Sequence, residues 1–192
     1  MKIIKAAAAV LMLLLLPSAG GGGRVQAAVV EGVRFSERIQ SGDADLKLRG
    51  AGLLRYMVFI KAYVAAFYLP EGTPSTAALA DVPKHLEIEY FHAIAAADFA
   101  KATRSGIARN MSLTGYQRIE PAVEELNGLY RDVKPGDRYS LTYLPGKGTT
   151  LALNGTPLGT VTGADFAAGL FAVWLGPAPL DEGLKRVLLG DG

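Results

Sequence analysis

Continuous and alternating runs of apolar residues predict most of the β-strands in this chain. The longest run, 55–69, has no Gly or Pro before Pro70, which is typical of a strand packed on both faces. At roughly 3.3 Å per residue this strand would be about 50 Å long, so we expect a bulge or bend within it, near 61–63. A glycine turn at 50–52 is predicted before it. Residues 85–92 alternate apolar and polar side chains, which indicates a half-exposed antiparallel strand.

Apolar residues at helical spacing predict the helices. One stripe runs from Phe99 to Ile107, and a second runs from Ile119 to Tyr130, with Pro121 placed in the first turn of its helix. The other segments are predicted, in order, as a strand at 29–35, a loop at 36–45, a helical turn at 76–80 capped by Ser75, strands at 139–143, 149–153 and 158–161 with a hairpin turn at Asn154-Gly155, a helix from Thr162 to Gly176, and a helix at 181–189.

The order of these elements is strands, two helices, strands and two more helices. Such segregation is typical of an α+β domain with a mainly antiparallel sheet and helices layered on one face. The sequence therefore predicts one domain, with a cleft between the sheet and the helices as the place where a ligand binds.

The N-terminus predicts a signal peptide at 1–27. Lys2 and Lys5 precede an apolar core of eleven residues, 6–16, and small residues near Ala27 suit a signal peptidase. Eleven residues are too few to span a bilayer, which takes about twenty, so we expect no stable membrane anchor. The mature domain is then 28–192, and its location is periplasmic or secreted.

Composition and charge exclude several classes of function. The chain has no Cys and only two His, so a thiolate or histidine metal site is not expected, and we predict no cofactor. Without 1–27 the chain carries 17 basic and 18 acidic residues, and it has no basic stripe. Nucleic acid is therefore not an expected partner.

Arg55 is the first candidate for a functional side chain, because burying a guanidinium in a strand costs several kcal/mol unless a partner is supplied. A ligand carboxylate is one such partner. Glu87, Glu89 or a backbone carbonyl is the structural alternative, in which Arg55 only holds the sheet together. A tyrosine in a strand, such as Tyr63, is more often a core residue than a ligand contact.

The segment Gly50-Ala51-Gly52-Leu53-Leu54-Arg55, followed by 59–69, resembles the signature strand of chalcone isomerase-like proteins. Further pieces follow in the same order, and they resemble the secreted bacterial branch of that family. They are Gly136-Asp137, Tyr143-Leu144-Pro145-Gly146, Asn154-Gly155, Trp174-Leu175-Gly176, Asp181 and Leu184-Lys185. The resemblance covers most of 29–190 and implies an open-faced β-sandwich, a large antiparallel sheet with helices layered on one face.

Plant chalcone isomerases close a flavanone ring without a cofactor, and the resemblance implies a partial match to their site. Arg55 matches their arginine, Tyr63 falls where their threonine lies, and Tyr116 matches a helical tyrosine. Ile119 and Val123 stand where those enzymes have lysine and asparagine. The Arg–Tyr pair resembles the fatty-acid-binding branch of the same fold, in which these two residues hold a carboxylate while the tail enters an apolar cleft.

This pairing is chemically sensible, since a guanidinium binds a carboxylate through two hydrogen bonds and a phenol donates another. Arg55 and Tyr63 are eight residues apart, so without a bulge both face the same side of one strand. We predict Arg55, Tyr63 and Tyr116 as ligand-binding residues.

Three hypotheses follow. The first is non-enzymatic binding of a lipophilic, fatty-acid-like carboxylate. The second is an isomerase or intramolecular lyase acting on an enone or phenolic substrate, with Arg55 stabilising an enolate. The third is an envelope protein that binds a partner and no small ligand. The sequence leaves the oligomeric state open.

Overall fold

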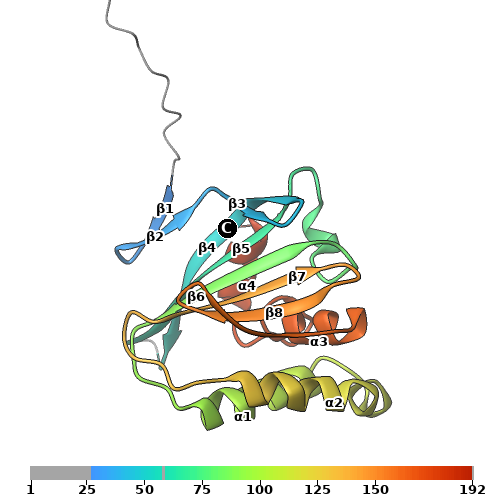
Figure 1. Cartoon of the computed structure of the whole chain (residues 1–192). Helices are drawn as coiled ribbons and strands as arrows, with labels where there is room; N and C mark the ends of the chain where they lie inside the picture. The colour runs from blue at the N-terminus through green and yellow to red at the C-terminus, as the bar shows by residue number, and fades with distance from the viewer. Residues whose placement is uncertain (1–26, 58, 192) are drawn as a thin grey trace, which may run out of the picture.

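The computed structural model describes residues 27–57 and 59–191 (Figure 1). The predicted signal peptide lies outside the described residues except for Ala27, which begins strand β1. Seven strands, β3 to β9, form one antiparallel sheet in which every strand pairs with its neighbour in the sequence. The strands are β1 Ala27–Val30, β2 Val33–Ser36, β3 Arg38–Ser41, β4 Ala44–Tyr56, β5 Ile60–Pro70, β6 Lys84–Tyr90, β7 Arg138–Leu144, β8 Gly148–Leu153 and β9 Thr156–Val161.

The helices lie on one face of this sheet, and the small β1–β2 hairpin lies on the other (Figure 1). The elements are η1 Ser75–Ala77, α1 Ala96–Ala108, α2 Leu113–Leu129, α3 Ala164–Leu175 and α4 Glu182–Leu189. This arrangement confirms the predicted α+β class and the open-faced β-sandwich.

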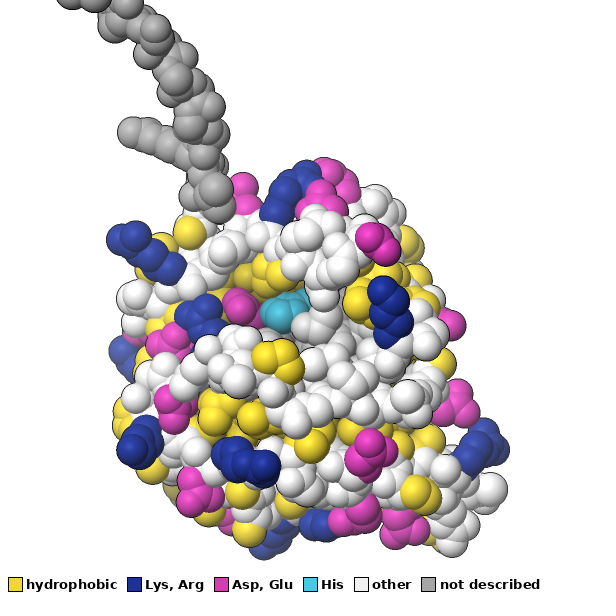
Figure 2. Space-filling model, in the orientation of Figure 1, with side chains coloured by type: hydrophobic (Ala, Val, Ile, Leu, Met, Phe, Trp, Pro, Cys, Tyr) yellow, Lys and Arg dark blue, Asp and Glu magenta, His cyan; other side chains and the backbone are white. Residues whose placement is uncertain are grey.

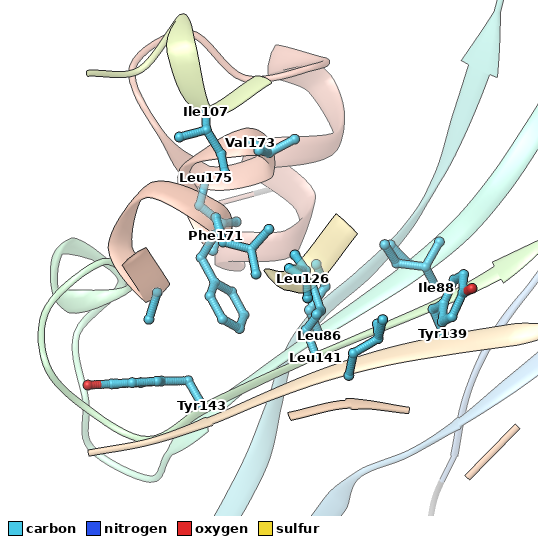
Figure 3. Close-up of a cluster of buried hydrophobic side chains, with 14 of the residues drawn as sticks. Leu86, Ile88, Ile107, Leu126, Tyr139, Leu141, Tyr143, Phe171, Val173 and Leu175 are labelled. Carbon is cyan, nitrogen blue, oxygen red and sulfur yellow. The ribbon is translucent and has the colours of Figure 1, made fainter. Parts of the chain in front are cut away.

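Alternation along the strands produces two hydrophobic cores, one on each face of the sheet. On β5, Tyr63, Ala65 and Phe67 belong to the large core beneath the helices, whereas Val64 and Ala66 belong to the small core beneath the β1–β2 hairpin. Figure 3 shows the large core, where side chains of the sheet meet side chains of the helices. The labelled residues in contact there are Leu86, Ile88, Tyr139 and Leu141 from the sheet, and Ile107, Leu126, Phe171, Val173 and Leu175 from the helices.

The predicted single strand at 55–69 is wrong, because the chain reverses between Tyr56 and Ile60 and forms the β4–β5 hairpin. No Gly, Pro or Asn marks this reversal in the sequence. Met57 instead takes a left-handed conformation with φ 49°. The expected bulge near 61–63 is confirmed at Ala62, because Leu54 pairs with Tyr63 while Arg55 pairs with Lys61.

The predicted turn at Gly50-Ala51-Gly52 is also wrong, because these residues lie inside β4. Helix α4 packs directly on this part of the strand. A Cβ at Gly50 would lie 1.8 Å from the carbonyl oxygen of Val187, and a Cβ at Gly52 would lie 3.0 Å from side-chain atoms of Leu184 and Val187. These glycines therefore allow a helix to approach the strand closely and do not turn the chain.

Smaller differences have local causes. The predicted strand at 29–35 is a hairpin, turned by Glu31-Gly32 with both φ angles positive, and the predicted loop at 36–45 contains β3. Pro121 lies in the middle of α2, because this helix begins earlier, where the Ser112 hydroxyl accepts a hydrogen bond from the Gly115 N–H at 3.1 Å. The turn η1 begins after Pro74 and has no side-chain cap from Ser75.

Lys84, the first residue of β6, is fully buried. Its Nζ donates a hydrogen bond to the carbonyl oxygen of Ala80 at 2.5 Å and lies 5.3 Å and 5.6 Å from the ring centroids of Tyr143 and Phe171. Burial lowers the pKa of the Lys84 ammonium group to about 8, and the nearby Asp81 carboxylate opposes this shift.

This lowered pKa predicts that the protein becomes more stable in mildly alkaline solution. Between the folded and unfolded pKa values of Lys84 the unfolded chain binds more protons, so stability rises with pH there. We expect the free energy of unfolding to increase by about 2 kcal/mol from about pH 7.5 to about pH 9.5, as measured by urea denaturation. In Lys84→Met, which keeps a similar volume without the charge, the increase should disappear. An equal increase in that variant would show that another group titrates.

Candidate functional site

A cavity of about 290 Å3 lies between the helical face of the sheet and helices α1 and α3. It is apolar because the strands above it place one residue in two on this face, and those residues are aliphatic or aromatic. Leu86 and Ile88 of β6, Leu141 of β7 and Leu151 of β8 form its wall on the sheet side. The helical wall includes Phe99, Ala102 and Thr103 of α1 and Val173 of α3. Figure 2 shows apolar side chains along the seam between the sheet and the helical layer.

Four tyrosines and one tryptophan bring most of the polar side chains into this wall, and Thr103 and Asp98 bring the others. The indole N–H of Trp174 donates to the Tyr63 hydroxyl at 3.0 Å, and the Tyr130 hydroxyl lies 2.9 Å from the Thr103 hydroxyl. The Tyr139 hydroxyl donates to the carbonyl oxygen of Arg131 at 2.8 Å and accepts from its backbone N–H at 2.7 Å. The hydroxyl groups of Tyr63, Tyr130 and Tyr139 therefore already have hydrogen-bond partners within the protein.

Tyr90 differs, because its hydroxyl makes no hydrogen bond within the described part of the chain. Its ring lies at the centre of an aromatic cluster, with centroids 5.8 Å from Tyr63, 5.2 Å from Phe99 and 6.1 Å from Tyr139, each edge to face. The ring is therefore fixed by packing while the hydroxyl remains free to bind a ligand.

The electrostatics of the cavity exclude a base at neutral pH among these tyrosines. Burial raises the pKa of Tyr63, Tyr90 and Tyr139, and it raises that of Tyr130 to about 12. All four phenols are thus neutral hydrogen-bond donors. Among the residues that the structure describes, those lining the cavity include one carboxylate, Asp98, and no Lys, Arg or His.

The structure places the three sequence-predicted site residues apart. Tyr63 lines the cavity. Arg55 lies on the opposite face of the sheet, because Tyr63 pairs with Leu54 and the next residue of β4 points the other way. The expected single strand, on which Arg55 and Tyr63 would share a face, does not form. Tyr116 lies at a separate hollow between α1 and α2, with Leu113. That Arg55 and Tyr116 contact a ligand stays a prediction.

The sequence argument assumed that Arg55 is buried, but the structure shows that it is not. Its side chain is 47% exposed and lies 3.4 Å from the carboxylate of Glu31, which Lys61 contacts at 2.5 Å. The carboxylates of Glu87 and Glu89, expected as structural partners of Arg55, are instead contacted by Arg138 at 3.5 Å and 2.7 Å.

Sequence reasoning missed Tyr90, Phe99, Tyr130, Tyr139 and Trp174 as cavity residues. It assigned them to apolar stripes, and they do lie on the core side of their elements. The signal that could have found them is the number of tyrosines on core-facing positions, since each brings a hydroxyl that must find a partner.

A polar cluster lies on the other face of the sheet, where Figure 2 shows a hollow with a histidine beside charged side chains. The Nδ1 atom of His85 lies 2.7 Å from the Thr142 hydroxyl, and Arg138 links Glu87 and Glu89 to the ring of Phe35. Arg138 therefore ties the β1–β2 hairpin to the sheet.

Within residues 27–57 and 59–191, no group of His, Cys, Asp and Glu is arranged to hold a metal ion. No helix in the same residues is long and apolar enough to cross a bilayer.

Comparisons with known proteins agree with this architecture. A family model described as chalcone isomerase-like matches residues 27–190. A search of curated proteins finds no match. Among solved structures, the chain is similar to a crystal structure of an Arabidopsis thaliana fatty-acid binding protein, with a TM-score of 0.69 and 16% sequence identity over 86% of this chain and 97% of that chain. At this identity the likeness shows a shared fold.

Proposed function

We propose that this chain, which belongs to the chalcone isomerase-like family, binds a fatty-acid-like molecule in the apolar cavity without changing it chemically. The observation that carries this proposal is the cavity itself, which is lined by aliphatic and aromatic side chains and holds one hydroxyl, that of Tyr90, free of partners within the described residues. The similar Arabidopsis thaliana protein, named as a fatty-acid binding protein, supports this ligand class.

The volume of the cavity suits a hydrocarbon chain. If a methylene group takes about the volume of a water molecule, about 30 Å3, then 290 Å3 holds roughly ten of them. Removing each from water contributes about 0.8 kcal/mol. A medium-length acyl chain therefore supplies enough apolar burial for binding.

The chemistry of the wall favours binding over catalysis. An isomerase acting on an enone or phenolic substrate needs a group that stabilises the developing oxyanion and a group that moves a proton. The described lining residues provide no cation to stabilise an oxyanion, and the buried phenols stay protonated at neutral pH. The one carboxylate among them, Asp98, is exposed to solvent, so a base there would have no oxyanion-stabilising group beside it. Arg55, to which the isomerase hypothesis gave the first role, lies on the other face of the sheet.

Ligand titration tests the proposal. Fatty acids of increasing chain length, added to the purified chain, should displace a fluorescent fatty-acid analogue and raise the melting temperature. Affinity should stop increasing once the chain fills the cavity. A protein whose melting temperature and reporter fluorescence respond to none of the acids has no such site.

The carboxyl group is expected to point inward, to the Tyr90 hydroxyl. Tyr90→Phe should then weaken fatty-acid binding about tenfold, which corresponds to about 1.4 kcal/mol for one lost hydrogen bond. An unpaired buried carboxylate is costly, so the acid binds in its protonated form and its affinity should rise as the pH is lowered. Calorimetric titration of both proteins at several pH values measures both effects.

Tyr116→Phe is the matched control, because Tyr116 lies outside the cavity. It should leave the affinity unchanged, as should Arg55→Ala. If Arg55→Ala abolishes binding and Tyr90→Phe does not, Arg55 holds the ligand carboxylate, as the sequence alone suggested.

The signal peptide, the periplasmic or secreted location and membership of the secreted bacterial branch remain proposals from the sequence. N-terminal sequencing of the protein recovered outside the cytoplasm tests them together, with a start near Ala28 as the expected result.

A further inference from the structure

The tip of the β4–β5 hairpin exposes large apolar side chains. Tyr56 is 61% exposed, Met57 71%, Phe59 88% and Ile60 43%. Folded proteins leave single large apolar residues exposed, but a contiguous group at the end of a hairpin marks a contact surface. These residues belong to the ends of β4 and β5 and to the turn between them, so their side chains project from the end of the hairpin.

This tip lies next to the mouth of the apolar cavity. Ala62, which lines the cavity, is three residues beyond Phe59 along the chain, a distance of about 10 Å at strand spacing. The backbone N–H of Phe91 donates to the carbonyl oxygen of Ala62 at 3.1 Å, which joins the hairpin close to its tip to the segment before α1. In Figure 1 the hairpin and the start of α1 lie at the same end of the sheet. Leu180, another lining residue, is itself 40% exposed.

Two cations flank the apolar tip on the face of the sheet that carries the β1–β2 hairpin. Arg55 and Lys61 are each about half exposed, and both contact Glu31, so the three groups carry one net positive charge. Long basic side chains beside exposed aromatic and aliphatic residues suit the surface of a bilayer, where the cations reach phosphate groups while the apolar side chains enter the acyl region.

We propose that the hairpin tip, formed by Tyr56, Met57, Phe59 and Ile60 with Arg55 and Lys61, docks on an anionic lipid bilayer. Docking there holds the mouth of the cavity against the membrane surface, so that an acyl chain passes between bilayer and cavity without crossing water. The docking itself depends only on the tip, whereas the transfer of an acyl chain rests on the proposed function.

Vesicle co-sedimentation tests the docking without any fatty acid. The chain should bind vesicles of phosphatidylcholine with about 30% phosphatidylglycerol, and salt should weaken the binding. Met57→Ser combined with Phe59→Ser should lower the partition coefficient at least about tenfold, because two exposed apolar anchors are lost. Both side chains are exposed, so the variant should keep the melting temperature of the parent.

Leu113→Ser is the matched control, since Leu113 is 74% exposed but lies at the start of α2 beside the separate hollow. It should bind vesicles like the parent. Parent and variants are compared both as the full chain and from Ala27 onward, because the apolar segment 6–16 is itself able to bind lipid. The shorter chain keeps every strand and helix that the structure describes.

Three results would overturn the proposal. In the first, the parent chain from Ala27 onward does not bind vesicles. In the second, the double variant binds vesicles as well as the parent does. In the third, the parent forms a dimer through the tip and does not bind lipid. Sedimentation velocity identifies the last case, in which the double variant is monomeric. A failure of fatty-acid binding would not imitate any of these results, because no fatty acid is present.

Discussion

Ala102→Trp is expected to weaken fatty-acid binding by at least about tenfold while the protein stays folded. Ala102 lies on α1, lines the cavity and is exposed at its mouth. An indole placed there covers apolar surface by turning into the cavity, and it takes space that the acyl chain would fill. Because the side chain starts from an exposed position, the substitution should change the free energy of unfolding little.

Reporter displacement with a medium-length fatty acid measures this effect, with the melting temperature as the check on folding. Ala97→Trp is the matched control, because Ala97 is exposed on the same helix but does not line the cavity. The control should keep the affinity of the parent. Equal affinities in the parent and a folded Ala102→Trp protein would mean that the ligand lies elsewhere, and the binding proposal for this cavity would be lost.

Gly50→Ala is expected to cause the largest loss of stability among single substitutions of glycine in β4, about 3 kcal/mol or more. The added Cβ would lie 1.8 Å from the carbonyl oxygen of Val187, a backbone atom of α4 that no side-chain rotation can move. The helix must therefore shift away from the sheet, which opens the contacts that Leu184 and Leu188 make with the large core.

Urea denaturation of three variants separates this clash from a general effect of replacing glycine. Gly52→Ala should cost less than Gly50→Ala, because its Cβ meets side-chain atoms of Leu184 and Val187 at 3.0 Å, which can move slightly. Gly128→Ala in α2 should stabilise the protein by about 0.5–1 kcal/mol, since nothing lies within 4 Å and alanine favours a helix. A Gly50→Ala protein as stable as the parent would show that α4 does not pack on β4 in this way.

Local patterns were sufficient to predict most elements and the class of the fold. The alternation at 85–92 corresponds to β6, and the turn at Asn154-Gly155 is a hairpin turn in which both residues have positive φ. The ordered pieces that resemble chalcone isomerase-like proteins identified the family that the family model matches over 27–190. Each of these signals is contained in a few neighbouring residues or in their order, so no knowledge of distant contacts was needed.

The reversal between β4 and β5 was decided by tertiary structure. Its segment is apolar and lacks turn residues, so short-range periodicity predicts a single strand. Pairing across the sheet reverses the chain between Tyr56 and Ile60, and this reversal sends Arg55 to the face opposite Tyr63. Likewise, Gly50 resembles a turn residue in the sequence, but the backbone of α4 is what requires a glycine there.

The sequence by itself determined the family, the class of the fold, and which side of most elements is apolar. Only the tertiary structure decided which residues form the site. Tyr63, Tyr90, Tyr130 and Tyr139 come from β5, β6, the end of α2 and β7, and they meet only when strand register and helix docking place them around one cavity. The physical reason is that periodicity shows whether a side chain is buried, whereas its neighbours depend on pairing between segments far apart in the chain.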